Sequence, residues 1–420
     1  MENFIQSACD ARLIPGAVVF ATDRTGRLDY RNVFGSHSLE DPTTYTPLAF
    51  DSTVWFASCT KLITSIAAMQ CVERGLVSLD EDVRALAPEL DDLEVLRGGE
   101  NGTIASRTKN TTPITLRQLL SHSSGFAYEF NSPTLQAWRN ETPESERPTP
   151  TSVRKRFLHP LLYEPGTSWS YGPSTDWAGV VVERVTGSTL QDYIVKNIFD
   201  PLDIKNLTFF LATRPDLQAK RAVMSWRTEE AEAVHSQHKQ PCFEPDFEDA
   251  SGGGGIFGAP GEYMKVLCAL LLATGQSASD AESYPPAQLL RRSTANALFE
   301  PQLGENGRKA LQGVSEIPRL NEMLGGMPPK TRKDWGLGGL VVLDDLPGWR
   351  NKGTLTWGGT PNLTWWIDRT AGICGLYSSQ IMPIGDAKSN EMVHAFEKDM
   401  YRRLAELNKG SERVDSPLDG

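Results

Sequence analysis

The fold of this chain is decided by the stretch Trp55-Phe56-Ala57-Ser58-Cys59-Thr60-Lys61, which opens an apolar run over residues 62–72. A hydroxyl and an amine three residues apart lie on one face of a helix. The start of a helix favours negative charge, because its first backbone N–H groups are unpaired and the helix dipole is positive there. Ser58 is therefore a candidate nucleophile and Lys61 its candidate base, with the pKa of the amine lowered by desolvation and this positive potential. The alternative is a capping serine followed by a solvated lysine, and S-x-x-K alone does not separate the two.

The run over residues 62–72 predicts a buried helix. Its residues are almost all apolar, so the helix has no polar face and belongs inside a large domain. Gly75 supplies a stop signal. The run is too short to cross a bilayer, which takes about 20 residues.

Composition narrows the class of protein. The chain has 420 residues, 39% hydrophobic and 9% aromatic, which is typical of a globular protein with a sizeable core. The net charge of -11 argues against nucleic acid as a partner. The first residues lack the basic and apolar segments of a secretory signal, and no long apolar run follows, so we expect a cytoplasmic protein with no membrane partner. The six cysteines have no zinc-like spacing, and we expect free thiols.

The first part of the chain predicts β-structure followed by helices. A short helix over residues 2–12 precedes two apolar segments, 17–21 and 28–34, which flank a turn and predict a β-hairpin. Polar composition predicts a loop over 98–112 and an exposed, lid-like loop over 139–155. Apolar periodicity predicts four further helices, over residues 115–120, 175–186, 190–198 and 261–273.

The last part of the chain predicts strands again. Four apolar segments are expected to be strands, over residues 337–343, 353–356, 363–368 and 373–378, before an amphipathic helix over 387–407. Strands at both ends of the chain favour an α+β fold with one sheet built from the two termini and a mostly helical inserted lobe. We expect residues 1–90 and 331–420 to form the α/β lobe, and residues 91–330 to form the mostly helical lobe with active-site loops. The successive glycines 252–255 match no phosphate-binding pattern and are interpreted as a wall of a cleft.

Three separated motifs carry a family resemblance: Ser58-Cys59-Thr60-Lys61, Tyr171-Gly172-Pro173-Ser174 and Trp357-Gly358-Gly359-Thr360. Together they resemble the active-site motifs of the serine β-lactamase and penicillin-binding-protein superfamily, in particular class C β-lactamases and their esterase relatives. The resemblance covers nearly the whole chain. It implies a β-lactamase/transpeptidase-like fold, in which an antiparallel sheet is flanked by helices and a mostly helical lobe is inserted.

Within this superfamily the chain is similar to the fungal lovastatin-type polyketide acyltransferases, which are transesterases. The segments that carry this similarity include Ile14-Pro15-Gly16-Ala17-Val18, Tyr263-Met264-Lys265-Val266-Leu267 and Gly336-Leu337-Gly338-Gly339. The resemblance implies an acyl thioester donor, on CoA or on the acyl carrier domain of a polyketide synthase, and a small-molecule acceptor hydroxyl of a secondary metabolite. It implies no cofactor in the protein itself, because any pantetheine would arrive with the donor.

The resemblance also assigns roles to individual residues. Ser58 would attack the thioester carbonyl, and Lys61 and Tyr171 would share its proton, since a phenolate is favoured beside an ammonium group. The backbone N–H groups of Ser58 and Thr360 would hold the oxyanion, with Thr360 on an edge strand beside the site; such a donor contributes about 3 kcal/mol.

The remaining candidate site residues are Gly359, Trp357 and Tyr128, assigned to oxyanion or substrate binding. Two positions depart from the β-lactam enzymes, which usually carry Asn where this chain has Ser174 and Lys or His where it has Trp357. Since that cation helps bind the carboxylate of a β-lactam, its replacement argues against β-lactam hydrolysis. Trp-Gly-Gly is instead similar to the esterase and acyltransferase branches.

Other functions remain open alternatives. The same acyl-enzyme attacked by water gives an esterase or thioesterase, and the motifs do not separate hydrolysis from transfer. A non-catalytic binding protein on this fold is disfavoured, because the chain contains Ser58, Lys61 and Tyr171 together. A Ser-His-Asp hydrolase is disfavoured because the chain has no G-x-S-x-G. A metal site at His235, His238 and Cys242 is conceivable only from spacing, and we expect no metal.

Overall fold

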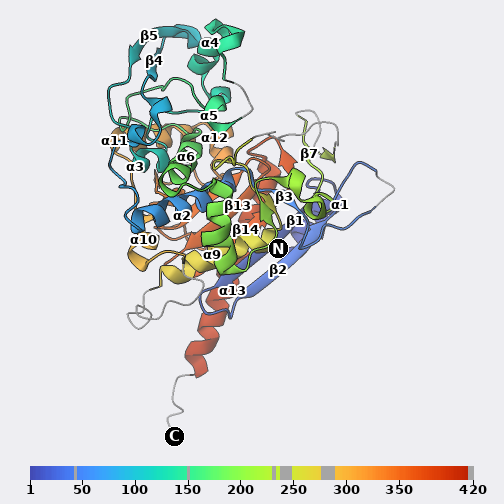
Figure 1. The fold of residues 1–420 in the computed structure, drawn as a ribbon. Helices are drawn as coiled ribbons and strands as arrows, with labels where there is room; N and C mark the ends of the chain where they lie inside the picture. The colour runs from blue at the N-terminus through green and yellow to red at the C-terminus, as the bar shows by residue number, and fades with distance from the viewer. Residues whose placement is uncertain (42–44, 149–151, 229–232, 237–247, 276–288, 415–420) are drawn as a thin grey trace.

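The centre of the molecule is a seven-stranded antiparallel sheet (Figure 1). The computed structural model describes residues 1–41, 45–148, 152–228, 233–236, 248–275 and 289–414. The strand order is β10-β11-β12-β13-β14-β1-β2. The strands are β1 (Gly16–Asp23), β2 (Asp29–Gly35), β10 (Lys333–Trp335), β11 (Leu340–Val342), β12 (Leu355–Gly359), β13 (Leu363–Asp368) and β14 (Ile373–Ser378). Segments near both ends of the chain therefore share one sheet, and the predicted α+β fold is confirmed.

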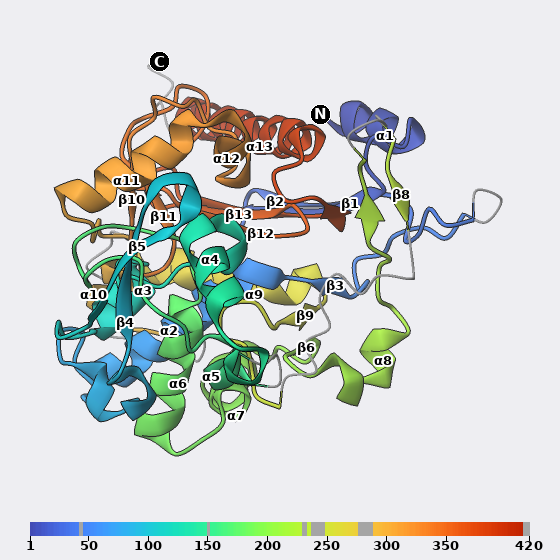
Figure 2. The ribbon, with the colours of Figure 1, turned by 90° about the horizontal axis from the view of Figure 1, so that it is seen from above.

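Helices cover both faces of this sheet. In Figure 2, α1 (Glu2–Asp10) and α13 (Ala387–Val414) lie on one side and α9 (Pro260–Ala273) on the other. Every residue of β13 and β14 is buried. Double coverage explains why these strands are continuous apolar runs in the sequence rather than alternating ones.

The predicted buried helix is α2 (Thr60–Glu73), and all of its residues from Thr60 to Cys71 are buried. It packs against α6 (Ser174–Thr186), which in turn packs against α3 (Leu116–Leu120). The stop signals act as expected, since Gly75 and Gly187 have φ of 70° and 66°. The predicted helices at 115–120, 175–186 and 261–273 are confirmed, and 190–198 divides into α7 (Leu190–Ile194) and a π-helical turn (Val195–Phe199).

The remaining elements are short. They are β3 (Val54–Trp55), β4 (Glu94–Gly98), β5 (Ile104–Lys109), β6 (Leu207–Thr208), β7 (Ser225–Trp226), β8 (His235–Ser236), β9 (Phe257–Gly258), β15 (Ile381–Met382), α4 (Pro133–Glu141), α5 (Val153–Arg156), α8 (Pro215–Gln218), α10 (Arg292–Ala297), α11 (Glu305–Glu316) and α12 (Pro318–Met323). No helix within the described ranges is both long and apolar enough to cross a membrane.

Two loop predictions were wrong. The polar stretch 98–112 contains β5, which pairs with β4; its side chains are almost all exposed, so no apolar alternation marks it as a strand. The expected lid-like loop over 139–155 includes the end of α4 and all but the last residue of α5; these helices begin after Ser132 and Ser152, whose side chains cap them. Residues 149–151 of that stretch lie outside the described part. The final helix also extends beyond the predicted 387–407, to Val414.

Candidate active site

Ser58 lies at a strained junction between β3 and α2. The preceding residue, Ala57, has a φ of 46°, which is uncommon for a residue with a side chain. The junction is held by the segment beyond the glycine stretch: Phe56 N–H donates to the Ile256 carbonyl at 2.9 Å, and Ile256 N–H donates to Thr60 Oγ1 at 3.1 Å. Ser58 itself is half-buried and lines the cavity described below.

Lys61 is buried and uses all three donors of its ammonium group. Its Nζ lies 3.3 Å from Ser58 Oγ, 3.1 Å from Tyr128 Oη and 2.6 Å from the carbonyl oxygen of Gly253. It also lies 4.8 Å from the ring centre of Tyr171. A side chain that is only 4% exposed would be costly to bury as a cation without such partners.

The expectation of a lowered pKa at Lys61 is wrong. Burial alone lowers the pKa of this amine, but the neighbouring Tyr128, Tyr171 and Asp176 outweigh burial and hold the pKa above its usual value. Sequence reasoning counted the desolvation and missed the acidic groups that the fold places around the amine. Lys61 is therefore protonated at neutral pH. Burial raises the pKa of the Tyr128 phenol above its usual value, against the lowering effect of the Lys61 charge.

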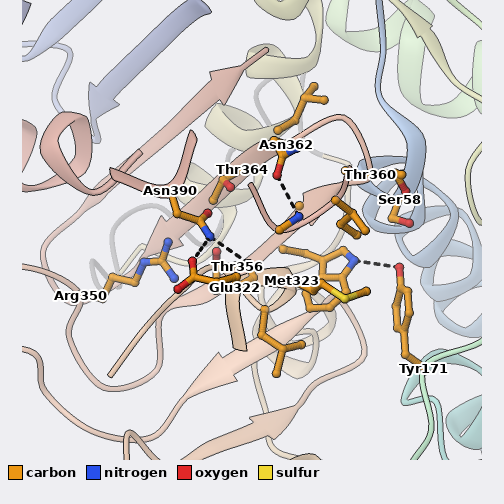
Figure 3. A pocket seen from close by; sticks show the side chains of 18 residues that line it. Ser58, Tyr171, Glu322, Met323, Arg350, Thr356, Thr360, Asn362, Thr364 and Asn390 are labelled. Carbon is orange, nitrogen blue, oxygen red and sulfur yellow. Dashed lines mark hydrogen bonds between the residues drawn. The ribbon is translucent and has the colours of Figure 1, made fainter. Parts of the chain in front are cut away.

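Tyr171 lies just before α6, and its hydroxyl is hydrogen-bonded by a side chain of β12. The indole Nε1–H of Trp357 donates to Tyr171 Oη at 3.0 Å, as Figure 3 shows. The Trp357 ring is held against Trp335, with ring centres 4.5 Å apart. The tryptophan that replaces the Lys or His of β-lactam enzymes is thus a hydrogen-bond donor to the second motif.

The third motif reaches the Ser58 junction because it contains glycine. A Cβ on Gly359 would lie 2.4 Å from the carbonyl oxygen of Phe56, so only glycine permits this approach. Thr360 follows directly and lines the same cavities as Ser58. The predicted edge strand is wrong as stated, because β12 lies between β11 and β13. Only its first two residues pair with β11, however, and Trp357–Gly359 pair with β13 alone.

Two cavities meet at Ser58. The larger has a volume of about 720 Å³ and is lined by Ser58, Tyr128, Tyr171 and Thr360. The smaller, of about 40 Å³, continues past Tyr171 and is lined by Trp357 and Gly359, with Asn390 and Glu322 at its far end (Figure 3). Six of the seven predicted site residues line these cavities, and Trp357 and Gly359 line only the smaller one. The seventh, Lys61, lines neither cavity and contacts Ser58 and Tyr128, which do.

Several residues of the larger cavity were missed by sequence reasoning. They are Glu129, Phe130, Arg139, Arg156, Phe157, Asp176, Met323 and Ile384, among others. Arg139 belongs to α4 and to the stretch predicted as a loop, and Arg156 is the last residue of α5, directly after that stretch. Met323 and Ile384 come from segments without any motif, and no sequence signal pointed to them. Asp176 lies two residues after the second motif, and no role was predicted for it.

Among the residues that the structure describes, the histidines and cysteines form no metal site. His122 is buried between Tyr171 and Trp335, and burial together with the Lys61 charge holds its pKa well below the usual value. His238 and Cys242 of the conceivable metal site lie outside the described residues. Within the described residues, no group of three or more His, Cys, Asp or Glu side chains is arranged to hold a metal ion.

The fold, the opening of Ser58 and Tyr171 to one cavity and the contact of Lys61 with both define an enzyme of the β-lactamase and penicillin-binding-protein type. The family model described as Beta-lactamase matches residues 1–396, and the chain therefore belongs to the beta-lactamase family.

Several similar proteins have acyl-transfer or ester-cleaving names. Monacolin J acid methylbutanoyltransferase of Aspergillus terreus is 38% identical over 408 residues, covering 96% of this chain and 95% of that protein. Lovastatin esterase of Penicillium rubens is 37% identical over 408 residues, covering 96% of this chain and 98% of that protein. The unliganded structure of simvastatin synthase from Aspergillus terreus superposes with a TM-score of 0.85 at 36% identity, covering 96% of this chain and 97% of that one. The relatives' names support an enzyme with acyltransferase activity, and the predicted β-lactamase-like fold is confirmed.

Proposed function

We propose that this enzyme moves an acyl group from a thioester to a hydroxyl of a small secondary metabolite, through an acyl-enzyme on Ser58. The observation that carries this proposal is the placement of Ser58 Oγ, 3.3 Å from Lys61 Nζ and open to a cavity of about 720 Å³. That volume is within the usual range for small-molecule sites. The names of the relatives support acyl transfer as the reaction.

The first half of the reaction forms the acyl-enzyme. Ser58 Oγ attacks the thioester carbonyl, and its proton passes to the oxygen of Tyr171. Because Lys61 is held as an ammonium group, it favours the phenolate of Tyr171 and cannot itself accept the proton. The C–S bond then breaks, the thiol leaves with the proton from Tyr171, and the acyl group remains on Ser58 as an ester.

The second half transfers the acyl group. The acceptor hydroxyl gives its proton to Tyr171 and attacks the Ser58 ester; the Ser58 C–O bond breaks, and Ser58 Oγ regains a proton from Tyr171. In both halves the backbone N–H groups of Ser58 and Thr360 stabilise the oxyanion. Every proton is returned, so the protein needs no cofactor.

The cavity walls favour a mostly apolar acceptor. Phe130, Phe157, Met323 and Ile384 provide apolar surface, and Arg156 provides a cation on the same wall. An acceptor with a fused-ring or long apolar body and an acidic group matches this lining. For the donor we propose an acyl thioester on CoA or on the carrier domain of a polyketide synthase.

A hydrolase is the second candidate function. One relative, 37% identical, is named an esterase, and the match covers 96% of this chain and 98% of that protein. The two functions share the acyl-enzyme and differ in whether water or an alcohol attacks it.

The experiment that tests the proposal measures how the acyl group is partitioned. The enzyme is incubated with butyryl-CoA, with and without a panel of polycyclic and long-chain alcohols, and ester and free acid are quantified by liquid chromatography and mass spectrometry. We expect at least one alcohol to yield more ester than acid and to raise the rate of CoA release. Acid at an unchanged rate with every alcohol would establish the hydrolase instead.

A further inference from the structure

The residue that accepts the shortest Lys61 bond, Gly253, is itself anchored through its backbone N–H. The carbonyl oxygen of Gly253 accepts from Lys61 Nζ at 2.6 Å, while the N–H of Gly253 donates to Asp176 Oδ1 at 2.9 Å. Ser251 Oγ donates to the same carboxylate oxygen at 2.7 Å. Asp176, the 251–253 segment and Lys61 thus form one chain of hydrogen bonds.

Asp176 is buried at the cavity wall rather than solvated on the helix surface. It is 1% exposed and lies in the first turn of α6. An acidic residue there usually stabilises its own helix. The Asp176 side chain is instead directed to the 251–253 segment, with two bonds on Oδ1. Within the described part of the chain, its Oδ2 has no hydrogen-bond partner.

The glycine at 253 is explained by the same contact. A Cβ at this position would lie 2.1 Å from Asp176 Oδ2, and would push the carboxylate away from the peptide. One member of the glycine stretch is therefore required by the approach of Asp176, and not by flexibility of a cleft wall.

From this geometry we propose that Asp176 is a positioning residue for the Ser58–Lys61 pair, acting through the Gly253 peptide. The inference rests on the proposed function, because it assigns a residue that orients the ammonium group beside the nucleophile. Asp176 has no contact with the reacting atoms and is not itself a catalytic residue.

The charge of Asp176 adds an effect that can be measured separately. The titratable groups that face Lys61 are Cys59 from the Ser58 junction, His122 and Tyr128 from the segment after α3, Tyr171 before α6, and Asp176. A negative charge at Asp176 favours the ammonium form and contributes to the raised pKa of Lys61. Removing that charge therefore lets Lys61 lose its proton at a lower pH.

Three variants of the full-length chain test the proposal. Asp176→Asn keeps an acceptor oxygen and removes the charge; Asp176→Ala removes both; Gly253→Ala displaces the carboxylate without changing it. The control is Asp249→Asn, which makes the same chemical change at a half-buried carboxylate that caps Val153 N–H and lies outside the Lys61 surroundings. Acylation is followed as the pre-steady-state burst with p-nitrophenyl butyrate from pH 6 to 10.5, and folding is checked by thermal unfolding.

We expect Asp176→Ala and Gly253→Ala to slow the burst about 100-fold, the size of effect that a misplacement of about 1 Å produces, with KM little changed. Asp176→Asn should slow it less and move the alkaline transition of the pH profile to lower pH. Asp249→Asn should match the wild type in both respects.

Two results would overturn the proposal in distinguishable ways. A folded Asp176→Ala with a burst within about 3-fold of the wild type, and an unshifted profile for Asp176→Asn, overturns the role of Asp176 alone. If the wild type gives no burst and a fluorophosphonate does not label Ser58, the proposed function fails and this inference fails with it.

Discussion

Replacing Trp357 by phenylalanine tests how the proton of Ser58 is handled. The indole Nε1–H of Trp357 donates to Tyr171 Oη at 3.0 Å, and phenylalanine removes this donor while keeping an aromatic ring against Trp335. The fold should survive, because the substituted ring lies among other aromatic side chains.

The size of the effect depends on the charge of Tyr171. A hydrogen bond between neutral groups contributes about 0.5–1.5 kcal/mol, whereas one to a charged group contributes about 1.5–3 kcal/mol. If Tyr171 is a phenolate when Ser58 attacks, loss of the donor should slow acylation by about 13- to 160-fold. If it stays neutral, the loss should be only about 2- to 13-fold.

The assay is the burst of p-nitrophenol from p-nitrophenyl butyrate, measured by stopped flow for the wild type, Trp357→Phe and Trp357→His. Both variants shrink the ring, but histidine can retain an N–H donor, so their difference isolates the hydrogen bond from the packing. We expect Trp357→Phe to slow the burst by about 13- to 160-fold, and Trp357→His to have a burst rate closer to that of the wild type. Equal rates for the two variants, or a Trp357→Phe rate within about 2-fold of the wild type, would refute the reasoning.

Three further predictions concern stability. Gly359→Ala should lower the free energy of unfolding by about 1–3 kcal/mol and also impair acylation, since its Cβ would lie 2.4 Å from the Phe56 carbonyl oxygen; unchanged thermal unfolding would contradict this. Glu397→Gln should lower the free energy of unfolding, measured in urea, by about 3–5 kcal/mol, because the guanidinium of Arg350, 1% exposed, loses its ion-pair partner. A decrease below about 1 kcal/mol would show that the ion pair contributes little to stability. Thr115→Ala should cost about 1 kcal/mol in the same measurement, through loss of the capping box of α3, while Thr115→Ser should be nearly neutral.

Much of the fold could be predicted because its signals are local. The 62–72 run is mostly apolar with almost no polar face, and the sequences of β13 and β14 are also mostly apolar, so their composition predicts burial. The strand β5 could not be predicted in this way, because its side chains are almost all exposed and its pairing with β4 holds it in place. The division of the chain into lobes at residues 90 and 331 stays a prediction.

The site was predictable only in its motifs. Ser58, Lys61 and Tyr171 follow from three motifs whose joint occurrence is specific, whereas the pKa of Lys61 depends on Asp176 and Tyr128, which are distant in sequence. Met323 and Ile384 lie in segments without a motif, so no local sequence pattern predicts that they line the cavity. The chemistry of the cavity wall therefore required the structure.

The most direct test of the account is intact-mass spectrometry of the protein incubated with butyryl-CoA, beside Ser58→Ala and Lys61→Ala. The account predicts that the wild type gains one butyryl group, that peptide mapping places it on Ser58, that Ser58→Ala gains none, and that Lys61→Ala gains it far more slowly. An equal gain on Ser58→Ala, or an adduct mapped to another residue, would contradict the assignment of Ser58 as the nucleophile.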